Sequence, residues 1–175
     1  MAPLNIRIFG DPILRMRALE VTEFDAQLRE LADDMLDTLR VAHGSAIAAN
    51  QVGVLKRLFV FDQDERVGAL VNPEVVETSL ETETEDEGCL SFPGLFYPTE
   101  RPLRAVLRGL DIHGEPAEQT GEGMFARMLL HELDHLNGIL FIDHLARHDR
   151  KDAMRRIRRG ELETPPQRQP STPEL

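Results

Sequence analysis

Hydrophobic residues recur at helical spacing in two segments of the chain. In residues 25–42 they form one stripe between mostly polar positions, and the stripe consists of Leu28, Leu31, Met35 and Leu39. Thr22 or Asp25 is placed to cap the start of this segment. In residues 124–138 the same spacing relates Met124, Met128, Leu129 and Leu136, and Gly138 is placed to end the run. The pattern therefore predicts two helices.

Strands are predicted where β-branched and aromatic residues gather between turn-forming residues. Residues 57–62, 67–71 and 103–112 fit this description. Residues 139–142, directly after the second predicted helix, are expected to be a short extended piece. The chain is thus expected to mix helices with strands.

The carboxy-terminal end changes in charge and composition. Residues 147–159 hold seven Lys or Arg, with the apolar residues Ala153, Met154 and Ile157 between them, which predicts a basic amphipathic helix. Residues 161–175 are polar and rich in proline, and we expect a disordered tail there. The predicted division is a catalytic domain at 1–146, a basic helix at 147–160 and the tail.

Composition narrows the class of protein. A chain of 175 residues is long enough for one domain with a hydrophobic core. Its net charge of −11 argues against a general nucleic-acid binder, and we expect no specific DNA partner. Cys89 is the single cysteine, so no disulfide can form within the chain. The amino terminus has no apolar run of signal-peptide length, and no segment is long enough to span a bilayer. We expect a soluble cytoplasmic protein without membrane contacts.

The second predicted helix carries the pattern His-Glu-x-x-His. His131 and His135 lie four residues apart, so their imidazoles fall on one face one turn apart and can bind one metal ion. Glu132 points about a quarter-turn away, near the water of such a metal but outside its ligands. The alternative is an amphipathic helix whose histidines happen to share a face with the core.

Two histidines leave a metal centre incomplete, and a metalloprotease is one way to complete it. One large protease class takes a third histidine at the position that here holds Phe141, which excludes that class. Another class takes a downstream glutamate, but Glu161 and Glu163 border the predicted tail. Cys89 completes the set instead: a thiolate and two imidazoles make a soft tetrahedral centre for Fe(II), Zn(II) or Co(II), with a fourth place for water.

Three stretches together resemble the peptide deformylase family. Residues 87–91, Glu-Gly-Cys-Leu-Ser, look identical to the family's metal-cysteine motif, and residues 131–138 look like its histidine motif. Residues 44–51, a run of small residues that ends in the amide of Gln51, resemble its first motif. The resemblance spans roughly residues 4–145, in matching order and spacing.

The resemblance implies an α+β fold in which the histidine helix is wrapped by antiparallel sheets. It also implies one divalent metal ion, Fe(II) as the native one, with zinc, nickel or cobalt able to take its place. The activity is removal of formyl from the N-formylmethionine of nascent peptides, with release of formate. Glu132 would be the general base that takes a proton from the metal-bound water, and the Gln51 amide and the Leu90 N–H would hold the oxyanion.

The substrate-binding segment departs from the family pattern. The family usually has a branched aliphatic residue at Ser45 and a glycine at Ala46, next to Gly44. We hypothesise that Ala46 narrows the groove and lowers activity on ordinary formyl-peptides or shifts the preference. Met128 lies on the same helix face as His131 and is expected either to line the methionine pocket or to be core.

Two other hypotheses concern partners and the loss of catalysis. In relatives a carboxy-terminal helix docks on the ribosome, which suits the positive charge of residues 147–160; a solvated helix that balances the acidic body is the alternative. The altered first motif also leaves open a deformylase-like paralogue with a shifted substrate, or with a role in binding peptides or ribosomes.

Overall fold

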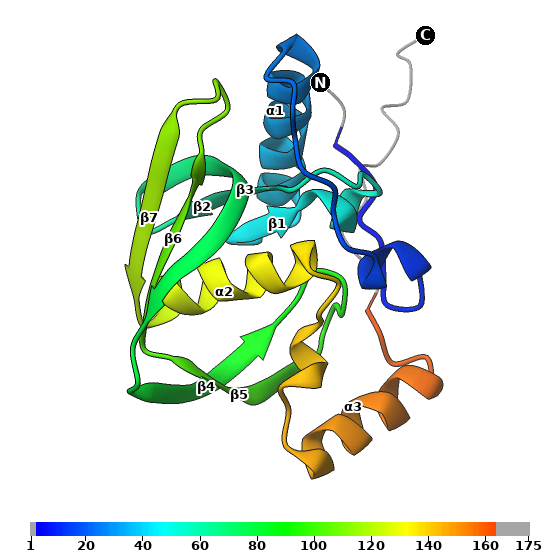
Figure 1. Cartoon of the computed structure of the whole chain (residues 1–175). Coiled ribbons are helices and arrows are strands. Elements are labelled where there is room, and N and C mark those ends of the chain that lie inside the picture. Colours follow the sequence, from blue (N-terminus) through cyan, green and yellow to red (C-terminus); the bar gives the residue numbers. More distant parts are fainter. Residues whose placement is uncertain (1–2, 164–175) are drawn as a thin grey trace, which may run out of the picture.

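The structure, a computed structural model, describes residues 3–163 (Figure 1). The helices are α1 (Ala26–Val41), α2 (Met124–Leu136) and α3 (Arg147–Arg158). The strands are β1 (Ala46–Ala48), β2 (Leu58–Gln63), β3 (Arg66–Thr78), β4 (Thr82–Gly88), β5 (Phe96–Pro102), β6 (Arg104–Leu110) and β7 (Pro116–Glu122). Short 3-10 helices are η1 (Pro12–Arg15), η2 (Ala49–Val52) and η3 (Phe141–Asp143). The predicted α+β class is confirmed.

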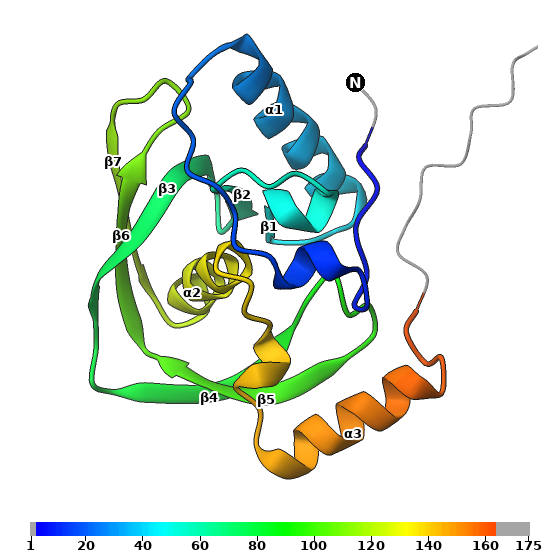
Figure 2. The ribbon, with the colours of Figure 1, turned by 45° about the vertical axis from the view of Figure 1, so that its right-hand side comes forward.

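The strands form two antiparallel sheets. Five strands join in the order β1-β2-β3-β6-β7, and β4 pairs only with β5 in a separate hairpin. Figure 2 shows α2 almost end-on, with the larger sheet on one side and the hairpin on the other. The predicted enclosure of the histidine helix by antiparallel sheets is therefore confirmed.

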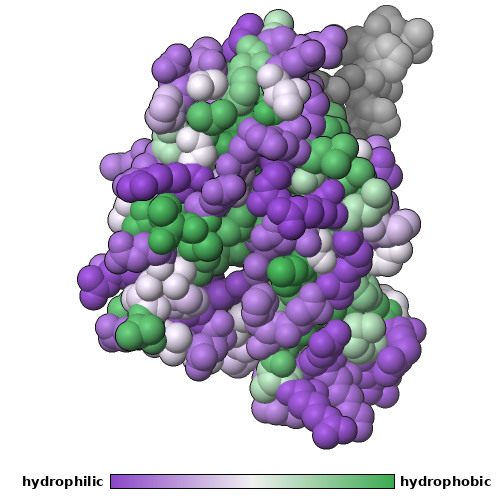
Figure 3. All heavy atoms as spheres, viewed as in Figure 1, coloured by the Kyte–Doolittle hydropathy of each residue, from purple (hydrophilic) through white to green (hydrophobic). Residues whose placement is uncertain are grey.

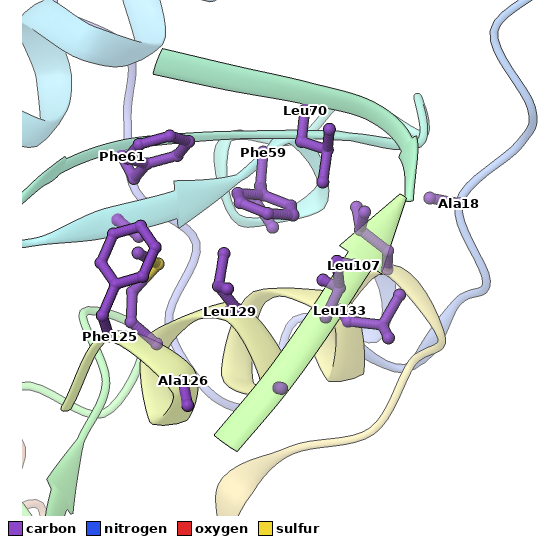
Figure 4. Packing of buried hydrophobic residues seen from close by; sticks show 14 residues of the cluster. Ala18, Phe59, Phe61, Leu70, Leu107, Phe125, Ala126, Leu129 and Leu133 are labelled. Atoms are coloured by element: carbon purple, nitrogen blue, oxygen red, sulfur yellow. The ribbon is translucent and has the colours of Figure 1, made fainter. Parts of the chain in front are cut away.

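The α2 helix packs on the larger sheet through one apolar face. Phe125, Leu129 and Leu133 meet Phe59 and Phe61 of β2 in a buried cluster (Figure 4). Burial of each such side chain contributes about 1.5–3 kcal/mol to folding, so this face fixes the helix on the sheet. The opposite face of α2 carries polar residues that face the β4–β5 hairpin.

The α1 helix covers the other face of β2. Leu58 and Val60 alternate with the two phenylalanines of that strand and join Met35 and Leu39 in a second buried cluster. Both faces of the first four residues of β2 are therefore apolar, which explains the unbroken hydrophobic run from Leu58 to Phe61. The Asp25 side chain caps α1 by accepting a hydrogen bond from the Leu28 N–H at 2.9 Å.

The basic helix is present as α3 and docks beside the hairpin. Ala153, Met154 and Ile157 belong to a third apolar cluster, and the Tyr97 hydroxyl donates to Asp152 at 2.8 Å. Beyond α3, the Glu163 N–H donates to the Pro93 carbonyl at 3.0 Å. Residues 164–175 of the predicted tail lie outside the described residues.

One local prediction was wrong. Residues 139–142 were expected to be extended, but the chain turns into η3 from Phe141 onward. The cause is Asp143, whose carboxylate accepts a hydrogen bond from the Leu140 N–H at 3.0 Å and closes the turn. Within residues 3–163, no helix has both the length and the apolar character needed to cross a membrane.

Candidate metal centre

Cys89 and the two histidines converge on one point between α2 and the hairpin. Cys89 follows β4, whereas His131 and His135 lie one turn apart on α2. A ligand atom from each residue lies within 4.8 Å of the others. The Cys89 Sγ is 3.2 Å from His135 Nε2, which is 3.1 Å from His131 Nε2. Three soft or intermediate donors at this spacing fit one metal ion of the first transition row.

Glycines at the ends of α2 and β4 allow the close packing of the segments that carry the two histidines and Cys89. Gly138 has a φ of 75° and ends α2, as its sequence position predicted. A Cβ atom there would lie 2.5 Å from the Arg15 carbonyl oxygen. Gly88 is the last residue of β4, and a Cβ atom there would lie 2.3 Å from the Phe96 ring.

A buried carboxylate orients the first histidine. Glu87 accepts from His131 Nδ1 at 2.6 Å, which leaves His131 Nε2 for the centre. It also accepts two hydrogen bonds from Arg101, at 2.7 and 3.0 Å, and one from Arg127 at 2.9 Å. Burial alone would raise the pKa of Glu87, but the hydrogen bonds from His131 and Arg101 lower it well below its usual range. Glu87 is therefore held as an anion.

Glu132 is a buried carboxyl that forms no ion pair with another described residue. Glu132 lines a cleft beside the centre, and its Oε2 has no hydrogen-bond partner among the described residues. Burial raises the pKa of Glu132 to about 7, although the charge of His131 opposes the shift. A carboxyl with this pKa can both accept and return a proton near neutral pH.

Gln51 is oriented with its amide nitrogen toward the sulfur. Its Oε1 accepts from the Ala48 N–H at 2.9 Å, and its Nε2 donates to Ser91 Oγ at 3.2 Å and lies 3.6 Å from Cys89 Sγ. Leu90 lies between Cys89 and Ser91 and lines the same cleft. The structure thus brings together all six residues proposed from sequence for metal binding and catalysis.

The candidate substrate residues line a cleft of about 640 Å³ beside the centre. Gly44 is packed so closely that a Cβ atom would lie 2.8 Å from both Leu39 and Leu90. Ser45, Ala46 and Met128 line the same cleft. Ala46 and Met128 also belong to the buried cluster between α2 and the five-stranded sheet, so Met128 lies both at the cleft and in the core.

Residues 3–151 match the family model of polypeptide deformylase. The chain belongs to this family. It is 50% identical over 161 residues to the peptide deformylase of Acidothermus cellulolyticus, covering 92% of this chain and 89% of the relative.

Solved deformylase structures have the same fold. A peptide deformylase from Legionella pneumophila superposes with a TM-score of 0.85 at 38% identity, over 94% of this chain and 100% of that one. A peptide deformylase from Synechococcus elongatus, in complex with actinonin, gives a TM-score of 0.84 at 37% identity, over 89% of this chain and 86% of that one. The deformylase family is metal-dependent, which agrees with the cluster formed by Cys89, His131 and His135.

The residues that a metalloprotease would use as its third metal ligand lie outside the metal-binding group, which agrees with membership of the deformylase family. Glu161 lies beyond α3 and pairs with Arg156 of that helix at 3.1 Å, and Glu163 lies at the rim of the cleft beside Gly94. Neither belongs to the group of metal-binding side chains found within residues 3–163. Phe141 is buried in the third apolar cluster.

Sequence reasoning missed the arginines behind the deformylase centre and the residues at its rim. Arg101 and Arg127 are separated from Glu87 by 14 and 40 residues, and no periodic pattern marks them. Phe96 and Met124 line the cleft although their side chains are largely exposed. The sequence shows that both residues are hydrophobic, but it does not show that they lie at the same cleft, because that depends on tertiary structure.

Proposed function

We propose that this protein removes the formyl group from N-formylmethionine at the amino terminus of nascent peptides and releases formate. One observation carries the proposal: a cysteine and two histidines converge beside a buried, unpaired glutamate, at the base of a cleft, in a member of the deformylase family. A structural metal site would have no use for that glutamate and would be closed by four protein ligands.

Cys89, His131 and His135 would hold one divalent metal ion. Fe(II) is the proposed native metal, and the same donors accept Zn(II), Ni(II) or Co(II). When bound, the metal supplies a Lewis acid and lowers the pKa of a coordinated water. Glu87 supports this ligand set because it fixes the His131 tautomer.

Glu132 is the proposed general base. It takes the proton of the attacking water and later returns it to the leaving amine of the methionine. Its pKa of about 7 suits both transfers. The position of Glu132, one residue after His131 on the same helix, keeps its carboxyl beside the centre without making it one of the three ligands.

Gln51 and the Leu90 N–H are the proposed donors to the developing oxyanion. The Gln51 carbonyl is held by the Ala48 N–H, so its NH₂ group is fixed before the substrate arrives. Preorganised donors of this kind stabilise the transition state without reorganisation. Gly44, Ser45, Ala46 and Met128 would bind the peptide backbone and the methionine side chain along the cleft.

We further propose that α3 docks on the ribosome, so that the enzyme works in the cytoplasm where its substrate emerges. Ala153 anchors the helix in the core, and its charged residues face outward; the surface over α3 in Figure 3 is mostly hydrophilic. Exposed Arg147, Lys151 and Arg158 suit contacts with rRNA phosphates. Replacing these three by Gln should weaken co-sedimentation with ribosomes and its salt dependence; unchanged co-sedimentation would contradict the docking.

The deformylase activity is tested by formate release from a formyl-Met-Ala peptide. The protein is purified without oxygen and loaded with Fe(II) or Ni(II), and metal content is measured on every sample. The Glu132→Gln variant keeps the shape of the side chain, so we expect it to retain metal and to lose turnover by about two to four orders of magnitude. A fully metallated protein without turnover would favour the binding paralogue and overturn the proposal.

A further inference from the structure

Arg127 is a buried arginine that the proposed reaction does not use. Its side chain is only 3% exposed, and it lies on α2 one turn before His131, on the same face of the helix. Burying a guanidinium is costly unless acceptors replace the water that it loses. The acceptors that Arg127 contacts therefore show which parts of the molecule it connects.

Every acceptor that the Arg127 side chain contacts within the described residues lies on the β4–β5 hairpin. Its Nη1 donates to Glu87 Oε2 at 2.9 Å and to the Thr99 carbonyl at 2.6 Å, and its Nη2 donates to the Glu83 carbonyl at 3.0 Å. Glu83 and Glu87 lie on β4, whereas Thr99 lies on β5. One side chain from α2 thus reaches both strands of the hairpin.

These contacts matter because the metal-binding side chains come from two separate bodies. The two histidines are carried by α2, which is packed on the five-stranded sheet, and Cys89 follows β4 of the hairpin. The hairpin forms a sheet of its own, apart from the five-stranded one. The distance between the sulfur and the two imidazoles therefore depends on how the hairpin is held against α2.

Few polar side-chain contacts cross from α2 to the hairpin in the described part of the chain. Besides those of Arg127, Arg101 donates to Asp134 at 2.6 Å and Glu87 contacts His131 at 2.6 Å. The Arg101 bond lies near the end of α2, whereas Arg127 acts near its start. His131 lies between these two attachments on α2, and His135 directly follows the second.

We propose that Arg127 is a positioning residue for the metal centre: it holds the hairpin against α2 and so keeps Cys89 at the distance that both histidines require. The inference rests on the proposed function, because it takes Cys89, His131 and His135 as ligands. Without Arg127, Glu87 would still be compensated by Arg101 and His131, but the hairpin would lose its attachment to the first half of α2.

Only an arginine side chain satisfies all three acceptors. Its planar group presents donors in fixed directions, so one residue can bond a carboxylate and two carbonyls in different directions. A lysine places one ammonium at a single point and can restore the bond to Glu87 without those to both strands. The Arg127→Lys variant should therefore lie between wild type and Arg127→Met.

The test uses Co(II) as the metal probe and does not depend on turnover. Thiolate-to-cobalt charge transfer and the ligand-field bands report the geometry of the centre, and a chelator in excess gives the rate of metal loss. We expect Arg127→Met to shift these bands and to lose Co(II) about 10-fold faster or more, with Arg127→Lys between it and wild type. The control is Arg108→Met, because Arg108 is exposed and pairs with Glu118 on the neighbouring strand, away from the centre; it should match wild type.

The outcomes separate this inference from the proposed function. A wild type that gives no thiolate–cobalt band contradicts the metal centre itself and everything that rests on it. A normal wild-type band together with unchanged bands and release rates in Arg127→Met overturns only the role of Arg127, even if the variant melts at a lower temperature. If Arg127→Met does not fold, the Arg127→Lys variant decides, and wild-type release of Co(II) from it would overturn the proposal.

Discussion

At the scale of single residues, Ala46 belongs both to the hydrophobic core and to the lining of the cleft. Its side chain belongs to the cluster that packs α2 on the sheet, and it is only 8% exposed. It also lines the cleft, beside Ser45. The methyl group that we hypothesise to narrow the substrate groove also packs in the core, so its removal should affect activity and stability in opposite directions.

We predict that Ala46→Gly raises kcat/KM for a formyl-Met peptide severalfold and lowers the free energy of unfolding by about 1 kcal/mol. Activity follows from a wider groove, and the loss of stability follows from the added backbone freedom of glycine in β1. Steady-state kinetics on metal-loaded protein and urea unfolding of both forms measure the two effects. A kcat/KM equal to that of wild type would end the idea that Ala46 limits the groove.

At the scale of elements, sequence patterns predicted segments with a clear period and missed those without one. The α1 and α2 helices were found because their apolar stripes recur every three or four residues, and β2 was found because it is apolar on both faces. The β4–β5 hairpin was not predicted, since the mostly acidic and exposed sequence of β4 suits a solvated strand and a loop equally, and β7 was missed because its sequence is polar. Their pairing is set by register with a partner strand, which no local pattern records.

The same distinction applies to the candidate site. His131 and His135 were placed by helix geometry alone, and Cys89 was placed by its motif. Arg127 was not found, because its acceptors on β4 and β5 are nearby only after the hairpin folds against α2. Ligand types can be predicted from a motif, whereas the contacts that hold the ligands together depend on tertiary structure.

The end of α2 provides a prediction at this scale. Gly138 and Gly160 both have left-handed backbone conformations, with φ of 75° and 72°. An alanine at either position costs about 1–2 kcal/mol for this conformation alone. At Gly138 the new Cβ would also lie 2.5 Å from the Arg15 carbonyl, whereas nothing in the described part of the chain lies within 4 Å at Gly160.

We therefore expect Gly138→Ala to lower the free energy of unfolding by about 1–3 kcal/mol more than Gly160→Ala does. Urea unfolding of the two variants measures the difference between their free energies of unfolding. Because both positions have a left-handed backbone conformation, its cost is common to the two variants and cancels in this difference. Equal destabilisation would mean that the loop near Arg15 moves aside without cost, and that the close approach does not fix the end of α2.

At the scale of the whole molecule, Asp143 connects both ends of the described chain. Its carboxylate accepts from Arg15 of η1 at 3.1 Å through Oδ1, and Arg150 of α3 lies 3.5 Å away. Burial would raise the pKa of Asp143, but the hydrogen bonds from Arg15 and the Leu140 N–H, with the charge of Arg150, lower it. The segments before α1 and after α2 thus share one anion.

The lowered pKa sets the direction of the pH dependence. A carboxyl whose pKa is lower in the folded state stabilises the fold above its unfolded value of about 3.9, and this contribution is lost as the pH falls through the folded value. We predict that Asp143→Asn lowers the free energy of unfolding by about 1 kcal/mol at pH 7, after allowance for solvent screening. The gap between variant and wild type should close as the pH falls below about 4.

Urea unfolding of both proteins from pH 7 to pH 3 measures this gap. Arg108→Met, which breaks an exposed pair on the sheet far from both ends, is the control for a general loss of surface charge interactions. A gap that stays constant over this range would mean that the Asp143→Asn variant is destabilised by the shape or hydrogen bonding of the new amide. A gap that closes while the control shows none would establish that the ionised form of Asp143 joins η1 to α3, and hence that α3 is held to the body by charge as well as by its apolar face.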